Sequence, residues 1–152
     1  MERTAVAEHG GEDAGVPYAA VDLDGGPGCI ARARRVAAAF LGALHSERGR
    51  PVSSRVLEGT QLVVSELVTN AVKYAPGPLR LELRAGDGTV DVTVCDGGPA
   101  LPAPAPGTDP GRVGRHGLEI VRALAQDFSV RPLPTGKRVT ARIALTDGAT
   151  GR

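Results

Sequence analysis

The chain has 152 residues, of which 41% are hydrophobic, so it can bury one core and we expect a single domain. Its formal net charge is +1 and 3% of its residues are aromatic. This argues against a nucleic-acid surface, which needs a basic stripe and stacking rings. No apolar run is long enough for a membrane span, and we expect no export signal. Cys29 and Cys95 have no metal or redox spacing, which favours reduced cysteines in a cytoplasmic protein.

The first half of the chain predicts a strand and two helices. Residues 1–16 are polar and Gly-rich, and we expect them to be disordered. Residues 18–23, YAAVDL, have the pattern of a short edge strand, and residues 29–48 carry apolar side chains at helical spacing. A second helix is expected over residues 54–74, with Ser53 or the serine that follows it as its N-cap.

The second half predicts four strands and one more helix. Residues 79–85 and 89–96 alternate around GDG, which indicates a β-hairpin. A Pro- and Gly-rich loop at 97–113 is longer than an ordinary connection. A helix then begins near Arg115, two strands follow around the turn PTGK, and a flexible tail covers 147–152. This order predicts an α+β fold, a two-layer sandwich with helices on one face of a mixed, mostly antiparallel sheet.

Asp96 ends a strand and continues its apolar stripe. Val90, Val92 and Val94 share its parity, so all four side chains should lie on the buried face. A carboxylate there is costly unless it is hydrogen-bonded, and the two glycines that follow leave space beside it. The pattern fits a pocket floor that accepts a hydrogen bond from a donor such as an exocyclic amine. It fits equally a strand-ending turn whose Asp binds local backbone N–H groups.

The second predicted helix carries a polar stripe. Glu66, Asn70, Lys73 and Tyr74 fall within roughly a quarter of the circumference at ~100° per residue, among apolar neighbours. An Asn amide oxygen can coordinate a hard cation such as Mg²⁺. A Glu one turn away can polarise a hydroxyl or water, and Lys73 can contact phosphate. The alternative is a solvated stripe with an i,i+4 hydrogen bond.

Glycines open the third predicted helix. Gly111, Gly114 and Gly117 in GRVGRHGLEIV leave backbone N–H groups free to face an anion. Glycine-rich helix starts are common, so this pattern is weak by itself. It is neither a Walker loop nor a dinucleotide-binding fingerprint. His116 is most simply a polar loop residue, with phosphate contact as the alternative.

These segments occur in an order that resembles the GHKL ATPases, the family of gyrase B and the histidine kinases. The chain is most similar to their small bacterial branch, the anti-sigma-factor serine/threonine kinases. SELVTNAVKYA matches the N-box of that branch, VCDGGPALP its D-x-G-x box and GRHGLEIVRALA its second glycine box. The resemblance covers about residues 18–145. It implies a Bergerat-type ATP-binding domain at 17–146, with an ATP lid at 97–113.

The resemblance also implies ATP and Mg²⁺ as cofactors and assigns roles to single residues. Glu66 would be the general base, and Asn70 would ligate the Mg²⁺ that bridges the ATP phosphates. Asp96 would accept from the adenine amino group, and Gly98 would let the base approach the backbone. The segment that would wrap the phosphates comprises Gly114, Arg115, His116, Gly117 and Leu118.

Members of this branch phosphorylate a small antagonist protein on Ser or Thr and otherwise sequester a sigma factor. The resemblance therefore implies a kinase with a sigma factor and an anti-anti-sigma protein as partners, and a homodimer as its assembly. In TGKR, Arg138 stands where the branch has the hydroxyl of a glycine-lysine-threonine turn, which leaves room for weakened catalysis. The alternatives are a non-catalytic ATP-binding switch that gates a protein partner, and a module whose pocket binds nothing.

Overall fold

The computed structural model describes residues 16–98 and 113–145, and in the second range the side chains from residue 118 onward. In chain order the elements are β1 (Tyr18–Leu23), α2 (Cys29–Glu47), α3 (Ser54–Tyr74), β2 (Leu79–Ala85), β3 (Thr89–Asp96), α4 (Val113–Leu124), β4 (Asp127–Leu133) and β5 (Gly136–Ala144). The segment predicted as disordered, the predicted lid and the predicted tail lie almost wholly outside the described residues, so these three remain predictions.

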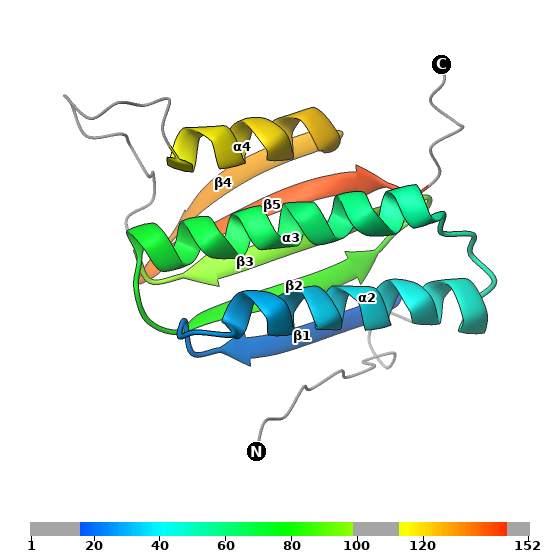
Figure 1. Ribbon diagram of the computed structural model, residues 1–152, viewed down its shortest axis with the longest axis horizontal. Coiled ribbons are helices and arrows are strands. Elements are labelled where there is room, and N and C mark those ends of the chain that lie inside the picture. Colours follow the sequence, from blue (N-terminus) through cyan, green and yellow to red (C-terminus); the bar gives the residue numbers. More distant parts are fainter. Residues whose placement is uncertain (1–15, 99–112, 146–152) are drawn as a thin grey trace.

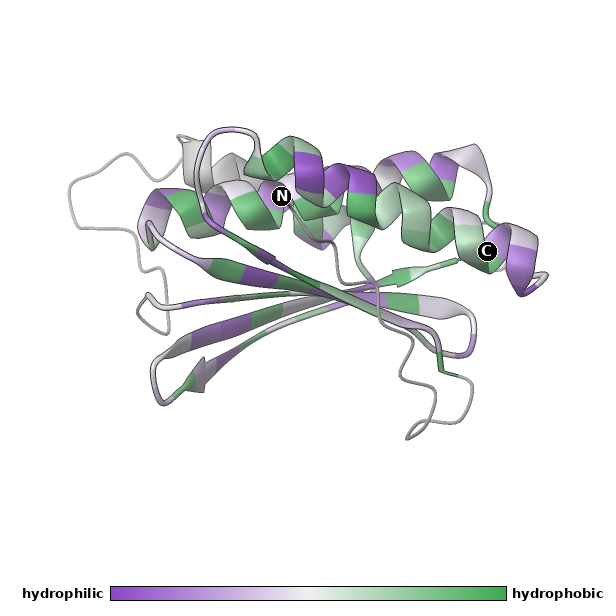
Figure 2. Ribbon diagram, turned by 90° about the horizontal axis from the view of Figure 1, so that it is seen from below, coloured by the Kyte–Doolittle hydropathy of each residue, from purple (hydrophilic) through white to green (hydrophobic). Residues whose placement is uncertain are grey.

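The helices form one layer and a five-stranded sheet forms the other. Figure 1 shows α3 over the middle of the sheet, α2 over β1 and β2, and α4 over β4. In Figure 2 all these helices lie above the same face. The strand order is β1-β2-β3-β5-β4, and each neighbouring pair is antiparallel. The predicted α+β sandwich is confirmed, and the described strands contain no parallel pair.

Local sequence explains where the two long helices begin and end. The α2 helix turns one apolar face to the sheet, with Ala33, Phe40 and Leu44 among its buried residues. Ser53 caps α3, because its side chain accepts a hydrogen bond from the Val56 backbone N–H at 3.1 Å. The proline after Ala75 disfavours helical backbone at that residue, so α3 ends at Tyr74. Nowhere in residues 16–98 or 113–145 is there a helix with the length and apolarity needed to cross a membrane.

The sheet has a buried apolar face and a polar face. The inner side chains of β2, β3 and β5 pack against the helices in one hydrophobic core. Val90, Val92 and Val94 are all buried there and Asp96 continues their row, so the predicted parity of this strand is confirmed. The outer face carries charged and hydroxyl side chains such as Glu82.

The last two strands are joined by a shorter turn than the sequence predicts. PTGK was the predicted turn, but β5 begins at Gly136, so Lys137 is part of the strand and pairs in register with Asp96. Because strand side chains alternate, Lys137 falls on the inner face and Arg138 on the outer face. The α4 helix also begins earlier than predicted, at Val113.

Candidate functional site

A cavity of about 300 Å³ lies between the helix layer and the sheet. Its wall is mostly apolar, with Leu67 of α3, Leu118 of α4 and Phe128 of β4 among the residues that line it. A few polar groups enter this apolar wall, which is the usual character of a small-molecule site. The polar lining residues are Asn70, Tyr74, Asp96, Arg122 and Lys137.

Asp96 forms the polar floor of this cavity at the end of β3, and its side chain is 1% exposed. Its Oδ1 accepts a hydrogen bond from the Gly98 backbone N–H at 2.8 Å and another from the Lys137 ammonium at 2.9 Å. Its Oδ2 is buried and has no partner within the described ranges. The local turn and the pocket floor, predicted as alternatives, therefore coexist: the turn uses Oδ1 and leaves Oδ2 as an acceptor.

Two glycines allow the backbone to close around Asp96. A Cβ at Gly98 would lie 2.6 Å from the Cβ of Ala75, so a side chain there would force the end of β3 away from the end of α3. Gly136 has φ +150°, and a Cβ there would collide with the backbone carbonyl of Asp96. Both positions therefore require glycine for close approach. The predicted approach of a base to Gly98 remains a prediction.

Only some of the polar residues predicted on α3 line the cavity. Asn70 is half-buried and lines the cavity. Glu66, one turn earlier, is also half-buried but is not part of the wall. Lys73 is exposed, and its ammonium nitrogen lies 5.8 Å from the centroid of the Tyr74 ring. The structure thus brings Asn70 and Asp96 to one cavity and leaves Glu66 and Lys73 beside it.

The glycine-flanked segment lies in the first turns of α4. Gly114, Arg115, His116 and Gly117 are all within this helix, while the side chains of residues 113–117 lie outside the described part. The first four backbone N–H groups of a helix have no acceptor within it, so this helix start can receive an anion. Leu118 lines the cavity, which places the first half of α4 at the same cavity as Asn70.

The donor set suits a magnesium ion that is held mainly by a ligand. Within the described residues, no group of three or more His, Cys, Asp or Glu could hold a metal. Asn70 lines the cavity, and its side chain carries one amide oxygen. Mg²⁺ is commonly bound through one or two protein oxygens together with water and substrate phosphates, so this residue fits such an ion.

The sequence did not predict Arg122, Phe128 or Lys137 as lining residues. The Arg122 guanidinium lies 5.2 Å from the centroid of the Phe128 ring, and together they form one wall. Arg122 could have been found from its i+4 spacing to Leu118. Lys137 could have been found by extending the alternation of β5 back from Val139, which also lines the cavity.

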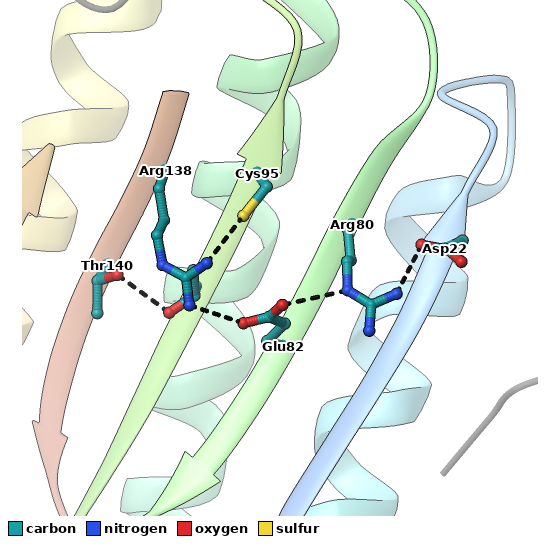
Figure 3. Close-up of polar contacts among 7 residues, drawn as sticks. Asp22, Arg80, Glu82, Cys95, Arg138 and Thr140 are labelled. Atoms are coloured by element: carbon teal, nitrogen blue, oxygen red, sulfur yellow. Dashed lines mark hydrogen bonds and ion pairs between the residues drawn. The ribbon is translucent and has the colours of Figure 1, made fainter. Parts of the chain in front are cut away.

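Arg138, by contrast, lies on the far face of the sheet (Figure 3). Its Nη2 donates to Glu82 Oε1 at 3.0 Å and its Nη1 donates to the Cys95 sulfur at 3.6 Å. Arg80 extends this row by donating to Glu82 and Asp22. Burial raises the pKa of the Cys95 thiol, and the Arg138 charge opposes this rise. The residue of TGKR that lines the cavity is therefore Lys137, and Arg138 does not line it.

Comparisons with known proteins agree with this geometry. A family model described as a histidine kinase-like ATPase domain matches residues 27–143. One similar solved structure is the histidine kinase domain from the Erythrobacter litoralis EL346 blue-light activated histidine kinase, with 26% identity and a TM-score of 0.53. The match covers 75% of this chain and 63% of that domain, so the chain spans only part of its relative. No curated protein matches the chain. The chain belongs to the histidine kinase-like ATPase domain family, an ATP-binding family of the GHKL superfamily.

Proposed function

We propose that this protein is an ATP-dependent serine/threonine protein kinase that acts as an anti-sigma regulator and phosphorylates an antagonist protein. The observation that carries the nucleotide part is the buried Asp96 Oδ2, an acceptor without a partner in residues 16–98 and 113–145, at the floor of the cavity. Such an atom needs a hydrogen-bond donor, and the amino group of adenine is one that fits. Protein substrate and sigma-factor partner are proposed from the similarity of the three sequence boxes to the anti-sigma kinases.

In this proposal the protein mainly positions the reacting groups and stabilises their charge, and it forms no covalent bond with the substrate. Asn70 ligates Mg²⁺, which when bound neutralises phosphate charge. Glu66 lies on α3 one turn before Asn70, so both side chains project from the same side of the helix. Glu66 accepts the proton of the substrate hydroxyl as its oxygen attacks the γ-phosphorus of ATP, and ADP leaves with the electrons of the broken bond. Lys73, exposed at the end of α3, contacts phosphate.

The second candidate function is a non-catalytic ATP-binding switch, supported by Arg138 in place of a hydroxyl and by the proline-rich segment 97–113. Arg138 pairs with Glu82 on the face of the sheet away from the cavity, so this residue offers no argument for lost catalysis. The proline-rich segment lies mostly outside the described residues, so we keep the switch as the second candidate and propose the kinase first.

A phosphoryl-transfer assay with labelled ATP tests the proposal. A pull-down with and without ATP would supply the sigma factor and the antagonist for this assay. We expect wild-type protein to label the antagonist on Ser or Thr. Glu66→Gln should lower transfer by about 10²–10⁴-fold while ATP still binds, because it removes the base. Glu58→Gln is the matched control, since Glu58 is an exposed carboxylate of the same helix.

The outcomes separate the hypotheses. Full transfer by Glu66→Gln would show that Glu66 is not the base. ATP binding without transfer to any captured partner would favour the switch. If neither ATP nor Mg-ATP raises the melting temperature at millimolar concentration, the chain does not bind the nucleotide and the proposal fails.

A further inference from the structure

Lys137 places an ammonium group inside the protein. Its side chain is 5% exposed, and it lies on β5 directly opposite Asp96 of β3 in the sheet register. Both residues line the cavity, and the Lys137 Nζ lies 2.9 Å from Asp96 Oδ1. Lysine is almost never buried unless it is paired. A buried ion pair contributes little net stability, so its place in the cavity wall calls for a functional explanation.

One oxygen of the Asp96 carboxylate accepts both of its hydrogen bonds. Oδ1 accepts from Lys137 and from the Gly98 N–H, whereas Oδ2 has no partner in the described part of the chain. An ammonium group only donates hydrogen bonds. Lys137 and the Gly98 N–H therefore fix the rotation of the carboxylate, and Oδ2 remains as the oxygen left for a ligand.

We propose that Lys137 makes the cavity selective for 6-amino purines over 6-oxo purines by holding Asp96 in this orientation. Adenine has an amino donor at position 6, whereas guanine and hypoxanthine have a carbonyl acceptor there. Two acceptors cannot share a hydrogen bond, so Oδ2 can accept from the 6-amino group of adenine but not from the 6-oxo group that takes its place in the other bases. Lys137 is a positioning residue that acts through Asp96. The inference rests on the proposed binding of ATP and adds the residue that sets its base preference.

The double variant Asp96→Asn/Lys137→Met reverses the hydrogen-bonding character of the floor. It removes both charges together, so neither is left buried alone. The Gly98 N–H still needs an acceptor, and the amide oxygen of the new Asn side chain takes the place of Oδ1. The amide nitrogen then takes the place of Oδ2 and offers a donor. The preferred base should change from 6-amino to 6-oxo.

The dissociation constants of ATP and ITP, measured by calorimetry with Mg²⁺, test this change. ITP carries a 6-oxo base without the extra 2-amino group of GTP. We expect wild type to bind ATP at least about tenfold more tightly than ITP, and the double variant to prefer ITP. Lys137→Met alone should lower the ratio of the ITP dissociation constant to the ATP dissociation constant. Lys137→Arg should leave this ratio unchanged, because arginine keeps a positive charge and hydrogen-bond donors. Arg138→Met is the matched control, since Arg138 is the next cation on the same strand but lies on the other face.

Each outcome bears on one of two claims. Wild-type protein that binds neither nucleotide overturns the proposed function itself. Wild-type protein that prefers ATP, with a double variant or a Lys137→Met variant that keeps the same preference to the same degree, overturns the role of Lys137 and leaves ATP binding intact. If Lys137→Met does not fold, an unchanged preference in the double variant still overturns the inference, because its floor carries no unpaired charge and presents the opposite hydrogen-bonding group. A changed ratio in Arg138→Met would also count against the inference, since that residue does not touch the cavity.

Discussion

The ion pair between Asp96 and Lys137 predicts a large energetic coupling in the free energy of unfolding. The two side chains are 1% and 5% exposed, so solvent does not screen their charges as it does at a surface pair. Lys137→Met leaves a buried carboxylate without its counter-charge, which should lower the free energy of unfolding by about 3–5 kcal/mol. Asp96→Asn leaves a buried ammonium and should cost a similar amount.

The double variant should be much more stable than the sum of the two single changes implies. It removes both charges and keeps an acceptor for the Gly98 N–H, so its stability should lie within about 1–2 kcal/mol of wild type. The coupling energy of the cycle is then about 4 kcal/mol or more. For a chain of this length, each kcal/mol shifts the melting temperature by about 2–4 °C, so the single variants should melt roughly 10 °C lower than wild type.

Urea denaturation of wild type, the two single variants and the double variant measures this cycle. The free energies of unfolding are compared with a common dependence on urea concentration. The matched control is the pair Arg142 and Asp91, which is 2.8 Å long but has side chains 50% and 25% exposed. Its cycle, with Arg142→Met and Asp91→Asn, should give a coupling below about 1 kcal/mol. If the buried pair gives no more than this surface pair, the reasoning is refuted, because Asp96 and Lys137 are then not joined in a dry environment.

Three further predictions address the cavity and the outer face. Gly98→Ala should lower stability by about 1–3 kcal/mol in denaturation, because its Cβ would meet Ala75, whereas Gly59→Ala in α3 meets no atom within 4 Å and should stabilise the helix. Asn70→Ala should reduce the rise in melting temperature on adding Mg-ATP, and EDTA should not reduce it further; an unchanged rise would exclude Asn70 as the metal ligand. Iodoacetamide should alkylate Cys95 slowly at neutral pH and faster above the ordinary thiol pKa, because burial raises its pKa and thiolate forms only at higher pH. Fast alkylation at neutral pH would contradict the burial of this thiol.

The parts of the fold that could be predicted are those where the spacing of apolar residues agrees with the capping, turn and proline residues at the ends of the element. The α3 helix begins after a serine cap and ends before a proline, so both of its bounds were correct. The hairpin of β2 and β3 was also placed correctly, because alternation is uninterrupted on both sides of GDG. The parity of Val90, Val92 and Val94 then predicted that Asp96 would be buried, which the structure confirms.

The partner of Asp96 could not be predicted in the same way. Sequence shows which residues share a face of one strand, but it does not show which strands are neighbours or in what register they pair. The residues of TGKR are typical of a turn, so the sequence predicted a loop there. In the structure Gly136 is already the first residue of β5, and its lack of a side chain lets it pass close to the Asp96 carbonyl. A shift of one residue in that strand would exchange Lys137 and Arg138 between the two faces. Which of these two cations lies beside Asp96 therefore depends on the register of one strand, and local propensity does not determine that register.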